Sequence, residues 1–82
     1  MRVAVDISLY PLDQEFIPPI DDFIARVNRH PSLEVVTNPM ATQIRGEYAD
    51  VMQALNDEIL GTFEAMPKAV FAIKILNNPL ED

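Results

Sequence analysis

The sequence predicts an α+β sandwich whose elements follow the order β-α-β-β-α-β, and three observations support it. Segments near both ends of the chain carry β-branched and apolar residues with a period of two, which is typical of strands. Two other segments carry apolar residues at helical spacing, and prolines and glycines separate the segments. The chain has 82 residues, of which 49% are hydrophobic, so we expect one folded domain over residues 1–82.

The first predicted strand runs from Arg2 to Leu9, and Pro11 is expected to close it. Apolar residues occupy every second position and smaller or polar ones lie between them: Val3, Val5, Ile7 and Leu9 against Arg2, Ala4, Asp6 and Ser8. The first predicted helix begins at Pro18 and Pro19, which suit a first helical turn, and Pro31 stops it. Its apolar stripe comprises Ile17, Ile20, Phe23, Ile24 and Val27.

Two short strands, Leu33 to Asn38 and Met40 to Arg45, are expected to form a hairpin around Asn38-Pro39. We expect Gly46 to end the second of them. The helix that follows carries an apolar stripe of Tyr48, Val51, Met52, Leu55, Ile59 and Phe63. The final strand is predicted from Lys68 to Leu76, and the polar tail from Asn77 to Asp82 is expected to be frayed.

Two right-handed crossovers of this kind give a ferredoxin-like fold, a four-stranded antiparallel sheet with two helices on one face. The other face would carry mostly small and apolar side chains: Ala4, Asp6, Ser8, Val70, Ala72, Lys74 and Leu76. In a sheet with one face open to water, strand residues alternate more cleanly between apolar on the buried face and polar on the open face. We therefore expect a second subunit to cover it, as in a homodimer or homotetramer.

Composition excludes several classes of function. A net charge of -7 disfavours binding to nucleic acid or to an anionic membrane. The chain has no cysteine and one histidine, so a disulfide scaffold is excluded and a zinc site is improbable. No signal segment and no apolar run of membrane-spanning length is present, which predicts a cytoplasmic protein.

No catalytic motif is present either, and we expect neither catalysis nor a cofactor. Gly46 and Gly61 are the only glycines, so the chain lacks a phosphate-binding glycine loop. His30 lies at a predicted helix end, where a histidine most often caps the helix. A small cofactor-independent enzyme stays open as an alternative, and it would need His30 or a carboxylate with a perturbed pKa in a cleft.

Binding is the alternative to catalysis, and five residues are candidates for it: Asp6, Ser8, Asn38, Met40 and Thr42. Asp6 and Ser8 share one face of the first strand, and Thr42 on the neighbouring third strand is expected to lie near Ser8. A carboxylate, an amide and hydroxyls beside an apolar wall can orient a flat heteroaromatic ring. Spacing alone favours a plainer interpretation, in which Asp6 pairs with Arg2 or Lys74 across strands.

Three short motifs favour ligand binding over the plainer interpretation. They are Ile7-Ser8-Leu9-Tyr10-Pro11-Leu12, the block from Asn38-Pro39-Met40 through Gly46-Glu47, and Ile73-Lys74-Ile75. Their order and spacing resemble those of the thiamine-binding protein family, which covers the YkoF-like and MTH1187-like proteins. The resemblance extends over nearly the whole chain.

The resemblance implies a ferredoxin-like subunit that dimerises, often into a dimer of dimers. It also implies binding of thiamine or its hydroxymethylpyrimidine moiety at a sheet face or subunit interface, without catalysis. Ser8, Met40 and Thr42 stand on motif positions, whereas Asp6 and Asn38 are added from the expected geometry. The alternative is an oligomeric interaction or regulatory module that binds no small ligand.

Overall fold

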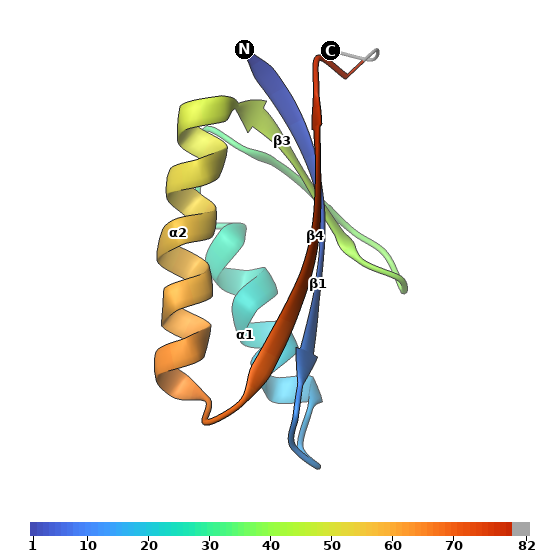
Figure 1. Ribbon diagram of the computed structural model, residues 1–82, viewed down its shortest axis with the longest axis vertical. Coiled ribbons are helices and arrows are strands. Elements are labelled where there is room, and N and C mark those ends of the chain that lie inside the picture. Colours follow the sequence, from blue (N-terminus) through green and yellow to red (C-terminus); the bar gives the residue numbers. More distant parts are fainter. Residues whose placement is uncertain (80–82) are drawn as a thin grey trace.

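A computed structural model describes residues 1–79 and confirms the predicted ferredoxin-like α+β fold (Figure 1). The elements are β1 (Arg2–Pro11), α1 (Ile17–Val27), β2 (Glu34–Thr37), β3 (Thr42–Glu47), α2 (Tyr48–Ala65) and β4 (Ala69–Asn77). The strands form one antiparallel sheet in the order β2-β3-β1-β4, and both helices lie on one side of it. Of the predicted polar tail, Asn77 ends β4, and residues 80–82 lie outside the described part of the chain.

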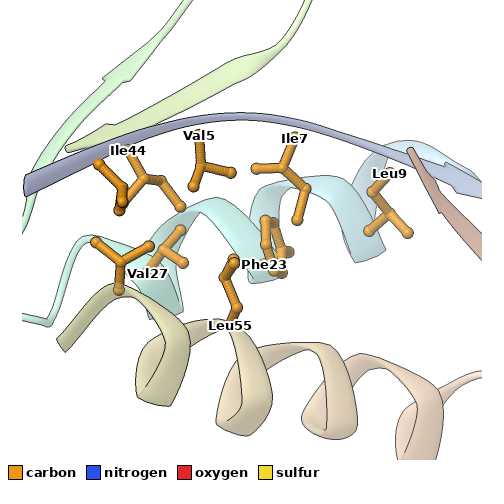
Figure 2. Packing of buried hydrophobic residues seen from close by; sticks show 9 residues of the cluster. Val5, Ile7, Leu9, Phe23, Val27, Ile44 and Leu55 are labelled. Atoms are coloured by element: carbon orange, nitrogen blue, oxygen red, sulfur yellow. The ribbon is translucent and has the colours of Figure 1, made fainter. Parts of the chain in front are cut away.

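The core lies between the sheet and the two helices. Every second residue of β1 is buried, as the period of two predicts. Figure 2 shows the side chains of Val5, Ile7 and Leu9 pointing from β1 toward the helices. Phe23 from α1 and Leu55 from α2 meet them, and each such fully buried side chain contributes about 1.5–3 kcal/mol.

The ends of both predicted helical stripes lie outside this core. Ile17, Tyr48 and Phe63 were expected to be buried, and all three are about half-exposed. Ile17 and Tyr48 are the first residues of their helices, and the buried residues of both helices lie farther along the chain. Phe63 lies at the margin of the core, where its ring contacts the Phe71 ring of β4 at a centroid distance of 5.6 Å.

Gly46 does not end the third strand, as the sequence had suggested. It lies inside β3, where it pairs with Val3 and is buried. A Cβ at this position would lie 3.0 Å from Leu33 Cδ2 and 3.3 Å from Val51 Cγ2. The missing side chain therefore allows α2 and the residues before β2 to pack closely against β3.

Candidate functional site

The sheet opens at one end because β1 is longer than its neighbour β3. Pairing between them runs from Arg2 opposite Glu47 to Ile7 opposite Thr42, and beyond Ile7 the strand β1 pairs only with β4. The tip of the β2–β3 hairpin projects away from the helices in Figure 1. A cavity of about 520 Å³ lies between this hairpin, the end of β1 and α1.

Apolar side chains form the walls and the mouth of the cavity. Ile20, Phe23 and Ile24 of α1 line its inner side. Around its mouth four large apolar or aromatic side chains are at least half-exposed: Tyr10, Leu12, Phe16 and Met40. Exposed apolar side chains gathered around a concave site are typical of ligand-binding grooves.

A few polar groups converge on the same space. The Ser8 hydroxyl donates a hydrogen bond to the Met40 carbonyl at 3.4 Å. The Thr37 and Thr42 hydroxyl oxygens lie 3.2 Å apart, so one donates to the other. Asn38 Oδ1 accepts hydrogen bonds from the backbone N–H groups of Met40 at 2.8 Å and Ala41 at 3.0 Å. Asn38 therefore shapes the hairpin turn with its oxygen, and its amide nitrogen makes no hydrogen bond within residues 1–79.

The structure brings four of the five candidate residues together and separates the fifth. Ser8, Asn38, Met40 and Thr42 all line the cavity. Asp6 does not line it, because Asp6 lies farther back on the open face of the sheet, opposite Gln43 and Lys74. Lys74, one of the two partners that the plainer interpretation gave Asp6, lies directly opposite it on β4.

Ser8 and Thr42 lie near one another, but on opposite faces of the sheet. Thr42 pairs with Ile7, so its side chain points toward the helices and is buried. Ser8, one residue along β1, points to the open face. The two hydroxyls therefore do not share a face, and the cavity, which both residues line, wraps around the end of the sheet and reaches both sides.

Sequence reasoning missed the aromatic and aliphatic residues at the mouth, Tyr10, Leu12 and Phe16. All three lie at or just beyond the end of β1, in a stretch that otherwise contains proline and acidic residues. Large apolar side chains in such a polar connection are a weak sequence signal for an exposed apolar surface.

A second polar cluster joins the two helices. Arg26 of α1 donates hydrogen bonds to Glu58 Oε1 at 2.7 Å, to the Glu58 carbonyl at 2.9 Å and to Thr62 Oγ1 at 2.6 Å. It also pairs with Asp22 Oδ2 at 2.9 Å. His30 Nε2 lies 2.7 Å from Glu58 Oε2, so the histidine ring contacts α2 instead of capping α1.

The charges in this cluster stabilise one another. Burial alone would raise the pKa of Glu58, but hydrogen bonds from His30 and Arg26 outweigh it and lower that pKa. Burial would likewise lower the pKa of Arg26, and its hydrogen bonds to Glu58 and Asp22 raise it. None of these residues lines the cavity described above. The cluster therefore holds the helices together and lies apart from the candidate site.

Comparison of the chain with models of known protein families finds a match to one family. The model of the thiamine-binding protein family matches residues 5–79. No curated protein matches the chain significantly. Within the described residues, neither helix is long and apolar enough to cross a membrane.

Several solved structures share the fold. A Streptococcus pneumoniae protein is 22% identical, with a TM-score of 0.90, and the match covers 98% of this chain and 90% of that one. A Thermotoga maritima protein provisionally assigned to thiamine biosynthesis or salvage is 18% identical, with a TM-score of 0.82 over 92% of this chain and 82% of that one. A hypothetical protein from Methanocaldococcus jannascii is 19% identical, with a TM-score of 0.83 over 99% and 84%.

Proposed function

The chain belongs to the thiamine-binding protein family, and from this premise we propose that it binds thiamine, or the hydroxymethylpyrimidine half of thiamine, without transforming it. The observation that carries the proposal is the position of the cavity. Two of the three motifs that resemble the family, the end of β1 and the hairpin between β2 and β3, form its sides. The cavity volume of about 520 Å³ also falls in the usual range for small-molecule sites.

The chemistry of the cavity suits the two halves of thiamine. The apolar wall of Ile20, Phe23 and Ile24 matches the faces of a pyrimidine ring, and the cavity's hydroxyls, such as that of Ser8, can bond polar groups of the ligand. The thiazolium half carries a positive charge. At the mouth it would meet the rings of Tyr10 and Phe16, which attract cations through their faces, on a protein of net charge -7.

The residue types in the cavity support binding over catalysis. Its described lining holds hydroxyls, one amide and one thioether, and none of its residues is a histidine, a carboxylate or a basic residue. General acid–base chemistry relies mainly on groups that exchange protons near neutral pH. His30 and Glu58 do not line the cavity and bond each other at the helix interface instead.

Calorimetric titration tests this proposal directly. Thiamine and hydroxymethylpyrimidine should each bind the purified protein, and pyridoxine, a ring of similar size with different polar groups, serves as the control ligand. Binding by thiamine and by hydroxymethylpyrimidine, but not by pyridoxine, supports the assignment. The absence of heat with both at high micromolar concentration would contradict it.

An oligomeric interaction module without a ligand is the second candidate. It is favoured by the exposed apolar side chains on the open face of the sheet, which include Val36 and Leu76. The two functions differ in the cavity. An interaction module needs no open space between β1 and the hairpin, so failure of every ligand in the titration would favour it.

A further inference from the structure

The end of β1 leaves one set of backbone groups facing the cavity without a strand partner. In antiparallel pairs the N–H and C=O of one residue point to the same neighbouring strand, and successive residues alternate. Leu12 N–H bonds the Lys68 carbonyl and the Arg2 carbonyl accepts from Asn78, so even-numbered residues of β1 face β4. The Met1 carbonyl accepts from Tyr48, so odd-numbered residues face the β3 side.

Leu9 is the first odd-numbered residue beyond the paired region. Pairing with β3 ends at Ile7 opposite Thr42, and continuation of the ladder would place Met40 opposite Leu9. Both backbone groups of Met40 are engaged elsewhere. Its N–H donates to Asn38 Oδ1 at 2.8 Å, and its carbonyl accepts from the Ser8 hydroxyl at 3.4 Å. Within residues 1–79, the Leu9 N–H and C=O therefore have no hydrogen-bond partner.

This open edge is too short to receive another strand. The next odd-numbered residue is Pro11, which has no N–H to donate. The edge thus offers a single donor with an adjacent acceptor at Leu9, inside a cavity that Leu9 itself lines. Backbone groups without a protein partner are normally satisfied by water, and a small ligand with one complementary acceptor and donor can replace that water here.

We propose that the Leu9 main chain is the specificity-determining element of the site and selects aminopyrimidines over oxopyrimidines; this inference rests on the proposed function. In an aminopyrimidine, a ring nitrogen that accepts a hydrogen bond lies next to an exocyclic amine that donates one. These two groups complement the N–H and C=O of one extended residue. In an oxopyrimidine the ring nitrogen carries a proton and the exocyclic oxygen accepts, so donor and acceptor are exchanged for a ring that the rest of the ligand holds in the same orientation.

The first arm of the test compares ligands. Thiamine and its oxo analogue, in which a carbonyl replaces the amine, differ only at this edge. Calorimetry should show thiamine binding at least about tenfold more tightly, because the oxo analogue leaves two cavity-facing backbone groups mismatched. Equal affinity for the two ligands would overturn the inference while leaving thiamine binding, and so the proposed function, intact.

The second arm changes the protein backbone. The 82-residue chain is short enough for chemical synthesis with an ester in place of the amide at Leu9, which removes this N–H and keeps the side chain. Thiamine affinity should fall about fivefold to tenfold. The unfolding midpoint should fall less than in the control below, because the Leu9 N–H has no partner in the free protein and only the Ser8 carbonyl, which bonds toward β4, becomes a weaker acceptor. An ester at Ile7, whose N–H faces β3 in the paired region, is the control and should lower the midpoint.

The outcomes separate the two ideas. If thiamine binds the Leu9 ester as tightly as it binds the normal chain, the Leu9 N–H does not contribute to recognition of the ligand and the inference is wrong. If the normal chain binds neither thiamine nor hydroxymethylpyrimidine, the proposed function fails, and the inference fails with it. Tighter binding of thiamine than of the oxo analogue, lost in the Leu9 ester, supports both.

Discussion

We expect the Met40 side chain to contribute to ligand binding and not to the stability of the fold. It is 85% exposed although it is large and apolar, so the free protein gains little from it. Met40→Ala should leave the free energy of unfolding within about 0.5 kcal/mol of the parent protein. It should weaken thiamine binding by about 1 kcal/mol, because a ligand in the cavity would cover the thioether. Denaturant unfolding and calorimetry measure the two effects.

Leu60 provides the matched control for Met40. It is an exposed apolar residue on α2, 53% accessible, and it does not line the cavity. Leu60→Ala should change neither stability nor affinity appreciably. A loss of affinity in Leu60→Ala equal to that in Met40→Ala would show that the effect is not local to the cavity.

Ser8 and Asp6 form a second residue-scale comparison, since they are two positions apart on the same face of β1. Ser8→Ala should weaken ligand binding by about 0.5–1.5 kcal/mol, through loss of one neutral hydrogen bond at the cavity. Asp6→Asn should leave the affinity unchanged, because Asp6 lies outside the cavity. Calorimetry on both variants decides the point, and a larger effect from Asp6 would move the site onto the open face.

At the scale of elements, the contact between the two helices explains why α2 contains a glycine. A Cβ on Gly61 would lie 2.6 Å from Arg26 Nη1, whose guanidinium is held by Glu58 and Thr62. Helix propensity alone favours alanine by about 1 kcal/mol. Gly61→Ala should nevertheless destabilise the protein by about 1 kcal/mol, since displacing Arg26 breaks hydrogen bonds to a charged group, each contributing about 1.5–3 kcal/mol.

A double-mutant cycle tests this explanation. Once Arg26→Ala has removed the guanidinium, Gly61→Ala should become stabilising by up to about 1 kcal/mol. Thermal or denaturant unfolding of the four proteins gives the coupling energy. The same destabilisation by Gly61→Ala in both backgrounds would show that Arg26 is not the reason for the glycine.

Glu58 makes this helix contact dependent on pH. Its pKa is lowered in the folded protein, where hydrogen bonds from His30 and Arg26 outweigh burial. A lowered pKa means that the contribution of Glu58 is present above the pKa of an unfolded-chain glutamate, about 4.3, and is lost as the pH falls through the folded value. Glu58→Gln should cost about 1–3 kcal/mol at pH 7 and progressively less below pH 4. Unfolding across this range checks the difference, and a cost that does not vary with pH would contradict it.

Element order and the buried face of β1 were predictable from sequence, whereas the register of β3 was not. Period-two burial in Val3 to Leu9 follows from local chemistry alone. The face of Thr42 depends on which residue of β1 it opposes, and a shift of one residue exchanges the faces. Asn38 draws Met40 and Ala41 into the turn, so β3 begins at Thr42 opposite Ile7.

The same reasoning explains which parts of the cavity could be predicted. Ser8, Met40 and Thr42 were found through motif positions. The open edge at Leu9 and the aromatic mouth at Tyr10 and Phe16 arise only where β1 extends beyond the end of β3 and lies beside α1. Such features result from the meeting of separate elements, and no local pattern in one element specifies them.

At the scale of the whole molecule, the open face of the sheet carries large exposed apolar side chains among its polar ones. Val36 pairs with Gln43 and so points to this face, where it is 60% exposed. Leu76 on β4, opposite Ala4, is 58% exposed on the same side. A solvated antiparallel face normally carries polar residues at such positions. These exposures support the expectation that a second copy of the chain covers the face.

Introducing charges on this face tests the assembly. A Val36→Asp, Leu76→Asp double variant should sediment as a monomer at micromolar concentrations at which the parent protein sediments as a dimer or tetramer, because a carboxylate without a partner is costly to bury in an interface. Charge changes on the helix side, such as Leu60→Asp, are the control. A parent protein that sediments as a monomer at those concentrations would contradict the covered face.

Assembly and binding should be coupled, because the cavity reaches the open face. Ser8 and Tyr10 point to that face and also line the cavity, so a second copy lying on the sheet would come close to a bound ligand. Thermodynamic linkage then makes the two effects equal. The factor by which assembly raises the affinity for thiamine is also the factor by which bound thiamine raises the association constant of the subunits. Sedimentation with and without thiamine should show this shift, and the charged double variant should bind thiamine more weakly. Equal affinity in the monomeric variant would instead mean that one subunit forms the complete site.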